Sequence, residues 1–186
     1  MPHPAARQLA HRSDVGHTPP MLHLPLRTLA LLCAVASGTA LAIALASERW
    51  EGLVPCALCL LERWPYRIVI VLALLALVVP LRFARLLLVA VVVAALADAA
   101  ISFVHVGVEA HWWPSPYPEC AAPRFSGGSI AERLASMPAR PAKPCDEAAY
   151  LIPGLPISMA AMNLMFTVVA AAALSFFLRR DARRPA

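Results

Sequence analysis

Long apolar runs limit the folds open to this sequence more than any other feature. The run Thr28–Ser47 contains no charged residue. As an α-helix rising about 1.5 Å per residue, it is long enough to cross a hydrocarbon layer of about 30 Å. Three further apolar runs follow: Ile68–Leu81, Leu86–Val108 and Ile157–Leu178. The run Ile68–Leu81 is short and reaches spanning length if its helix starts near Trp64. We predict an all-α membrane protein built as a bundle of four transmembrane helices.

Composition supports lipid as the solvent. Of the 186 residues, 60% are hydrophobic and 15% are charged, whereas soluble domains are about 45–50% apolar. The formal net charge is +5, but the basic residues are mostly arginines that flank the apolar runs. This is the pattern of membrane topology signals rather than of a basic groove, so we predict no nucleic-acid partner.

Four spans place both termini on one side of the membrane. The hairpin Pro80–Arg85 and the C-terminal tail are short and basic, which marks that side as cytoplasmic. The first residues are rich in Pro, His and Arg without apolar periodicity, which predicts disorder. The predicted organisation is a disordered extension (1–26), a membrane domain (27–180) with non-cytoplasmic loops at about 48–63 and 109–156, and a basic tail (181–186).

Four of the five cysteines fall on the non-cytoplasmic side of this topology: Cys56, Cys59, Cys120 and Cys145. Disulfides form in oxidising compartments, and four cysteines there fit two bridges with three possible connectivities. Cys33 lies inside the first helix among Leu and Ala. We interpret it as a small buried hydrophobe and assign it no role.

The two later cysteines lie in the long loop among many prolines. A bridge between Cys120 and Cys145 would stabilise this loop by about 3 kcal/mol in the chain-entropy model. The pair is therefore either a structural bridge or a redox pair, and its residues alone leave both interpretations open.

The Cys-x-x-Cys pair is different, because a bridge across two residues closes almost no loop and stabilises little. Such pairs are typical of redox or metal sites. A structural zinc site needs four ligands and usually a second close pair, which the loop cysteines do not offer. His105 and His111 are the residues available to complete such a site. We predict redox chemistry and no metal, with zinc as the alternative.

Arg63 follows the pair closely. If the chain is helical after Pro55, Cys59 and Arg63 lie four positions apart on one face. Arg63 then favours a Cys59 thiolate or hydrogen-bonds an acceptor held beside it. The alternative is an interface anchor paired with Glu62 or with solvent. We prefer the redox role because of the sulfur nearby.

Two features near the third run need separate interpretation. A carboxylate inside a span usually faces the bundle and has a partner, and we predict a structural Asp98–Arg67 pair. The stretch Glu109–Trp113 reads "EAHWW". It fits an interfacial amphipathic segment or a pair of belt tryptophans equally well.

The residues around the first pair resemble a known signature. The pattern Pro55-Cys56-x-Leu58-Cys59-x-x-Glu62-Arg63 is similar to that of the bacterial disulfide bond formation protein B (DsbB) family. The stretch His105–Cys120 resembles that family's approach to its second cysteine pair. The order of helices and loops also matches, and the resemblance covers about 27–180.

This resemblance implies an inner-membrane thiol oxidase. Such an enzyme reoxidises a periplasmic thioredoxin-like protein of the DsbA type and passes the electrons to a membrane quinone, ubiquinone or menaquinone. It implies that Cys120 forms the mixed disulfide with the partner, with Cys145 as its companion, and that Cys56 exchanges with that pair. Cys59 would meet the quinone, and Arg63 would stabilise that contact.

Two other classes remain as alternatives. Relatives of the vitamin K epoxide reductases also place a Cys-x-x-Cys in a four-helix bundle, but their pair comes late in the chain, and here it comes early. A metal-binding or purely structural membrane protein is the alternative from outside the enzymes.

Overall fold

The computed structural model describes residues 24–120, 129–135, 143–152 and 154–183. Within these residues the chain forms helices and no strands, which confirms the predicted all-α class. Most of the predicted N-terminal extension and the end of the predicted tail lie outside the described residues. The elements are α2 (Leu26–Trp50), α3 (Ala57–Val78), α4 (Leu81–Glu109), η1 (Pro118–Cys120), α5 (Ile130–Ala135) and α6 (Met159–Ala182).

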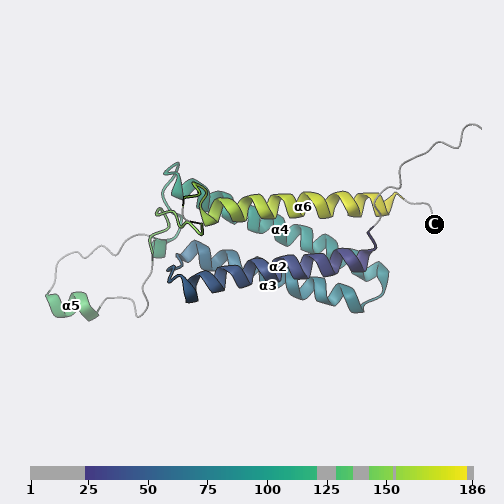
Figure 1. Ribbon diagram of the computed structural model, residues 1–186, viewed down its shortest axis with the longest axis horizontal. Helices are drawn as coiled ribbons and strands as arrows, with labels where there is room; N and C mark the ends of the chain where they lie inside the picture. The colour runs from purple at the N-terminus through teal and green to yellow at the C-terminus, as the bar shows by residue number, and fades with distance from the viewer. Residues whose placement is uncertain (1–23, 121–128, 136–142, 153, 184–186) are drawn as a thin grey trace, which may run out of the picture.

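Four of these helices form an elongated bundle (Figure 1). Helix α3 packs against α2 and α4, and α4 packs against α6. The connections α2–α3 and α4–α6 lie at one end of the bundle, and the two ends of the described chain lie at the other. Helix α4 begins at Leu81, directly after Pro80. The predicted basic hairpin is therefore mostly helical, and only a tight connection separates α3 from α4.

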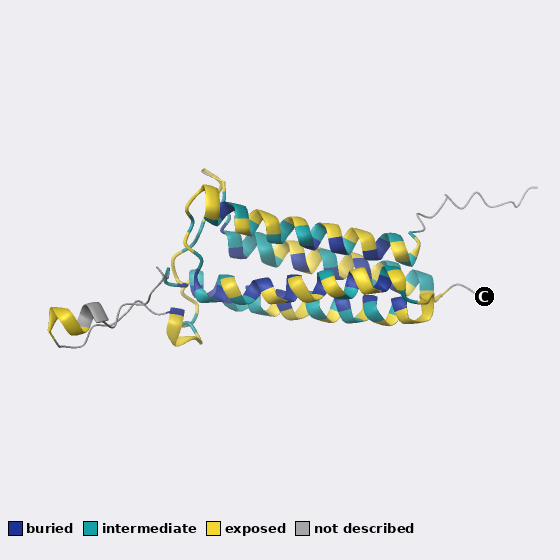
Figure 2. Ribbon diagram, turned by 90° about the horizontal axis from the view of Figure 1, so that it is seen from below, coloured by how far each residue is buried: buried dark blue, intermediate teal, exposed yellow. Residues whose placement is uncertain are grey.

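Three helices are long and apolar enough to cross a membrane: α2, α4 and α6. Only 22–28% of their most apolar stretches is buried inside the bundle, and Figure 2 shows exposed residues along its outer faces. A multi-pass membrane protein follows from these surfaces. Helix α3 carries Glu62, Arg63 and Arg67 in its first half. Its role as a fourth span, and the topology of the loops, stay predictions.

The bundle interior differs between its two ends. Near the chain ends, small and branched apolar side chains fill it, among them Ala30, Val69, Leu88 and Leu174. Toward the cysteine end, buried polar residues replace them, among them Glu62, Ser102 and His105. Polar chemistry is therefore concentrated at the end where the loops are.

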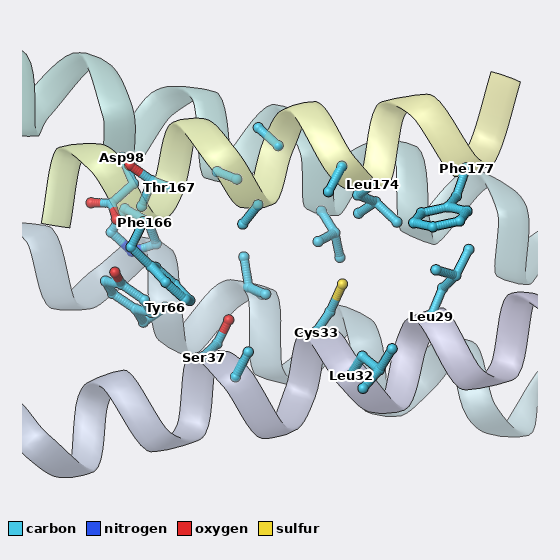
Figure 3. Close-up of a pocket in the computed structure, with 18 of the residues that line it drawn as sticks. Leu29, Leu32, Cys33, Ser37, Tyr66, Asp98, Phe166, Thr167, Leu174 and Phe177 are labelled. Atoms are coloured by element: carbon cyan, nitrogen blue, oxygen red, sulfur yellow. The ribbon is translucent and has the colours of Figure 1, made fainter. Parts of the chain in front are cut away.

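A cavity of about 210 Å³ lies between α2, α3, α4 and α6 (Figure 3). Cys33 lines it among apolar side chains and is half-buried rather than fully buried as predicted. Asp98 lines the same cavity, and its Oδ1 has no hydrogen-bond partner among the described residues.

The predicted Asp98–Arg67 pair is wrong. Arg67 is exposed, and its guanidinium lies 5.0 Å from the centre of the Trp64 ring. The α3 residue that lines the cavity with Asp98 is Tyr66. Arg67 shares a helix face with Trp64, three residues earlier, and that face is exposed.

Candidate functional site

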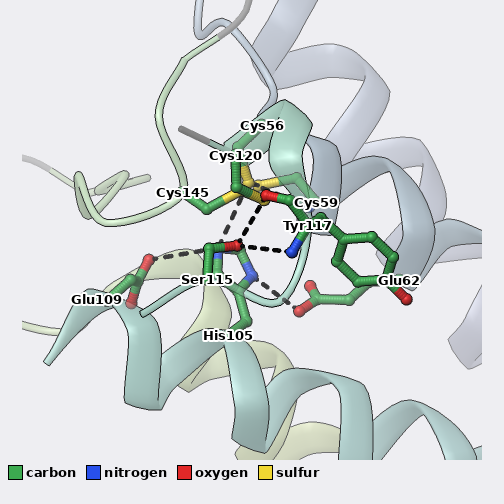
Figure 4. The surroundings of a disulfide bond; sticks show 9 residues. All are labelled: Cys56, Cys59, Glu62, His105, Glu109, Ser115, Tyr117, Cys120 and Cys145. Carbon is green, nitrogen blue, oxygen red and sulfur yellow. Dashed lines mark hydrogen bonds and ion pairs between the residues drawn. A yellow bond between two sulfur atoms is a disulfide. The ribbon is translucent and has the colours of Figure 1, made fainter. Parts of the chain in front are cut away.

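The two cysteine pairs meet at one end of the bundle (Figure 4). Cys120 and Cys145 form a disulfide, with their Cα atoms 4.9 Å apart. Cys56 and Cys59 are free thiols whose sulfur atoms lie 2.9 Å apart. Cys56 belongs to one buried cluster with both loop cysteines, and Cys59 packs against that cluster. The long loop thus places its disulfide directly on the start of α3.

The Cys-x-x-Cys pair opens a helix. Cys56 is the N-cap of α3 in an extended conformation, and its Sγ accepts a hydrogen bond from the backbone N–H of Cys59 at 3.2 Å. Ser or Asp usually holds this position. Hydrogen bonding with the Cys59 thiol, the largest influence, holds the pKa of the Cys56 thiol below its ordinary value, although burial opposes this. The chain is therefore helical from Ala57, which meets the condition for Cys59 and Arg63 to share a helix face.

Arg63 lies one turn after Cys59, and both side chains line the same cavity. Its terminal nitrogen forms an ion pair with Glu48 at the end of α2. The anchoring partner is therefore Glu48, rather than the predicted alternatives Glu62 or solvent. The Nε atom of Arg63 is buried and has no hydrogen-bond partner among the described residues.

The cavity beside Cys59 has a volume of about 440 Å³ and lies between α2, α3 and α6. Its wall is mostly apolar and includes a few polar side chains. Binding sites for small organic molecules have this composition. Its lining includes Ile43, Cys59, Glu62, Arg63, Tyr66, Met159, Met162, Asn163 and Phe166.

His105 reaches the thiol pair from α4. Its Nε2 lies 3.4 Å from the Sγ of Cys56, and its Nδ1 lies 2.9 Å from Oε1 of Glu62. Only 2% of His105 and 7% of Glu62 are exposed. Sequence reasoning named His105 as a residue available to complete a zinc site, and it predicted no contact of His105 with Glu62. Glu62 was part of the motif without an assigned role.

A polar network continues from Glu62 into α6. Its Oε2 accepts a hydrogen bond from the side-chain amide of Asn163 at 3.1 Å. The same amide donates to the hydroxyl of Ser102 at 2.7 Å, and Tyr66 donates to the amide oxygen. Asn163 lies in an uncharged run, where the sequence pattern gave no signal for it. These bonds fix the carboxylate that faces His105.

The chain after α4 folds back on the helix. The indole N–H of Trp113 donates to the carbonyl of Val104 at 3.1 Å. A Cβ atom at Gly107 would overlap the Trp113 ring, so glycine is required at this close approach. Trp113 packs against the cysteine cluster, whereas 62% of Trp112 is exposed. Helix α4 therefore ends within the stretch "EAHWW", at Glu109 with Ala110 as its cap. The second tryptophan of the stretch, Trp113, is part of the site.

Three potential metal ligands converge here. The ligand atoms of Cys56, Cys59 and His105 all lie within 4.8 Å of one another. His111 is exposed and lies 3.0 Å, through Nδ1, from the carbonyl of Glu109. The described part of the chain adds no fourth Cys, His, Asp or Glu to this group. This group is one ligand short of a closed structural zinc site, and zinc stays the alternative to redox chemistry.

Comparison with known proteins gives one family. The family model described as "Disulfide bond formation protein DsbB" matches residues 26–177. No curated protein and no solved structure matches the chain. The matched range contains all four long helices, except the last residues of α6, and both cysteine pairs.

Proposed function

The chain belongs to the DsbB family and is therefore a disulfide oxidoreductase of disulfide bond formation in the membrane; we propose that it is an inner-membrane thiol oxidase. It reoxidises a periplasmic thioredoxin-like protein of the DsbA type and passes the electrons to a membrane quinone. The observation that carries this proposal is the cluster in which two cysteine pairs touch, with an apolar cavity beside Cys59.

The loop pair is the proposed contact with the soluble partner. Cys120 forms the mixed disulfide with that protein, and Cys145 is its companion. Exchange with Cys56 then moves the two electrons to the helix pair. The contact between Cys56 and the loop cysteines in one buried cluster supports this exchange, since a thiolate must reach the sulfur that it attacks.

The cavity beside Cys59 fits a quinone. Its apolar wall suits a prenylated ring, and the unpartnered Nε of Arg63 suits a ring oxygen. When bound, a quinone is an oxidant that accepts two electrons and two protons. Cys59 and Arg63 would hold it, with the side chains of Tyr66 and Asn163 at the same wall. Ubiquinone and menaquinone share this chemistry.

The proposed topology follows from the same arrangement. The cysteine end faces the periplasm, where disulfides persist, and both chain ends face the cytoplasm. In this topology α3 is the fourth span. Its charged first half lies at the outer surface, where Arg67 and Trp64 stack as interfacial anchors do.

Turnover with two substrates tests this function. We expect the purified chain, mixed with a reduced thioredoxin-like protein and a soluble quinone analogue, to bleach the quinone absorbance as the partner becomes oxidised. A chain that oxidises the partner without consuming quinone would contradict the proposal. So would purification with stoichiometric zinc that masks the thiols of Cys56 and Cys59, which is the result expected for a metal site.

A further inference from the structure

A buried histidine and a buried carboxylate stand in line behind Cys56. The Sγ of Cys56 lies 3.4 Å from Nε2 of His105, and Nδ1 of His105 lies 2.9 Å from Oε1 of Glu62. Figure 4 shows the imidazole between the thiol and the carboxylate. The three groups come from two helices, and each is at least nine-tenths buried. This is the order of nucleophile, base and orienting group found in catalytic triads.

We propose that His105 is the general acid–base catalyst of Cys56 and that Glu62 is its positioning residue. This inference rests on the proposed function for its reaction, but it concerns a proton step that the cysteine motif leaves open. Only the thiolate attacks a disulfide or leaves from one. A buried thiol has no water to take its proton, so a base within contact distance is required.

The step balances within the chain. In the transfer from the loop pair, the first loop thiol gives its proton to His105 and attacks the Cys56–Cys59 disulfide at Cys56, and Cys59 leaves as a thiolate. The second loop thiol gives its proton to the Cys59 thiolate, attacks the first loop sulfur, restores the Cys120–Cys145 bond and releases Cys56 as a thiolate. His105 then gives its proton to Cys56 through Nε2. When Cys56 next attacks the sulfur of Cys59, with a quinone as the two-electron oxidant, Nε2 takes the proton back.

Glu62 makes His105 suitable both for giving a proton to Cys56 and for taking it back. Its carboxylate accepts from Nδ1–H, which leaves Nε2 toward the sulfur, and it stabilises the imidazolium that forms. Asn163 holds the other carboxylate oxygen. Glu62 also lines the cavity beside Cys59, so the carboxylate connects the base with the place where protons are consumed.

If His105 only filled space, its replacement would not change the pH at which the Cys56 thiolate forms. The charged or titratable groups that face His105 are Cys56 and Cys59 from the start of α3, Glu62 from its second turn, and Glu109 from α4, whose Oε1 lies 4.0 Å from Nε2. An imidazolium among them stabilises the Cys56 thiolate. Its removal therefore raises the pH at which that thiolate forms. A packing role would leave this pH unchanged.

The test follows thiolate absorbance in the ultraviolet against pH. The full chain carries serine in place of Cys33, Cys120 and Cys145, so only the helix pair titrates. His105→Asn keeps a donor toward Glu62 but has no base at Nε2, and His105→Gln keeps a polar group toward the sulfur. His111→Gln is the matched control, because that histidine is exposed and its Nδ1 lies 3.0 Å from the backbone carbonyl of Glu109.

We expect both His105 variants to raise the midpoint of the first thiolate by at least about one pH unit, which is about tenfold less thiolate at pH 7. The His111 variant should titrate like the parent. In the chain with its loop cysteines, both His105 variants should slow exchange between the pairs about a hundredfold at pH 7. An unchanged midpoint in either folded His105 variant overturns the proposal.

Glu62→Gln provides an independent check. It should slow exchange in the parent chain and have no further effect in the His105→Asn chain, because a positioning residue acts through the base. Equal slowing in both backgrounds would remove Glu62 from this role. The titration uses neither quinone nor partner protein, so its outcome is separate from that of the turnover assay for the proposed function.

Discussion

The two cysteine pairs differ in what surrounds them. Cys120 and Cys145 lie in connecting chain at the end of the bundle, already joined in a disulfide. Cys56 and Cys59 begin a long helix as free thiols, beside a histidine, a carboxylate and a cavity. Both loop cysteines are as deeply buried as Cys56, so the pairs differ in redox state and in neighbouring groups rather than in exposure. The difference teaches that the pairs are not interchangeable.

The largest expected effect separates Cys59 from the free cysteine elsewhere in the bundle. Cys59→Ser should abolish quinone reduction, because it removes the sulfur that lines the cavity. Cys33→Ser should leave the rate unchanged, since Cys33 lies in the other cavity among apolar side chains. Quinone absorbance with the pre-reduced chain measures both. Residual reduction by the Cys59 variant would place the electron exit at another sulfur.

The next largest effect concerns Arg63, whose substitution should affect the reaction of the helix pair with quinone more than the exchange between the two cysteine pairs. Arg63→Gln should slow quinone reduction about a hundredfold, the usual cost of losing one donor to a developing negative oxygen. Exchange between the cysteine pairs should change much less. Stopped-flow absorbance and quenched-flow disulfide mapping give the two rates.

Two controls distinguish a ligand contact from an anchor. Arg67→Gln changes an exposed arginine of the same helix and should have no effect on either rate. Glu48→Gln removes the ion-pair partner of Arg63 and leaves its guanidinium in place. If Glu48→Gln slows quinone reduction as much as Arg63→Gln does, Arg63 acts only as an anchor between α2 and α3.

The smallest expected effect concerns the contact between Gly107 and Trp113, which packs against the cysteine cluster. Gly107→Ala forces a methyl group into the Trp113 ring, and overpacking of this kind costs about 1–3 kcal/mol. Gly38→Ala in α2 meets no atom within 4 Å and should stabilise the helix by about 0.5–1 kcal/mol. Thermal unfolding should therefore shift in opposite directions. Exchange between the cysteine pairs should slow only in the Gly107 variant. Equal exchange rates in both variants would show that Trp113 has no role in the site.

The fold was largely predictable because spanning helices have a length and hydropathy that few other elements share. Boundaries were less accurate. Helix α3 starts at Ala57, well before its apolar run, and an ion pair with Glu48 of α2 accommodates Arg63 in its first half. The pairing of Asp98 failed for a similar reason: charge complementarity does not say which face of α3 points inward.

The site was predictable where chemistry is local and not where it depends on packing. A Cys-x-x-Cys spacing and a following arginine are visible in a short stretch of sequence. The contact of His105 with Cys56 joins residues 49 positions apart, and that of Asn163 with Glu62 joins residues 101 positions apart. No local pattern encodes such distances. They follow from the rotation of α3, α4 and α6 about their axes, which the side-chain packing of the whole bundle determines.

One measurement tests most directly whether the helix pair reacts with quinone and the loop pair with the soluble partner. The Cys120→Ser/Cys145→Ser chain, reduced and mixed with one equivalent of quinone analogue, should reduce the quinone at the wild-type rate and form the Cys56–Cys59 disulfide. The same chain should not turn over with a reduced thioredoxin-like protein. Failure of that quinone reduction, or continued turnover with the partner, would contradict the assignment of one pair to the membrane oxidant and the other to the soluble protein.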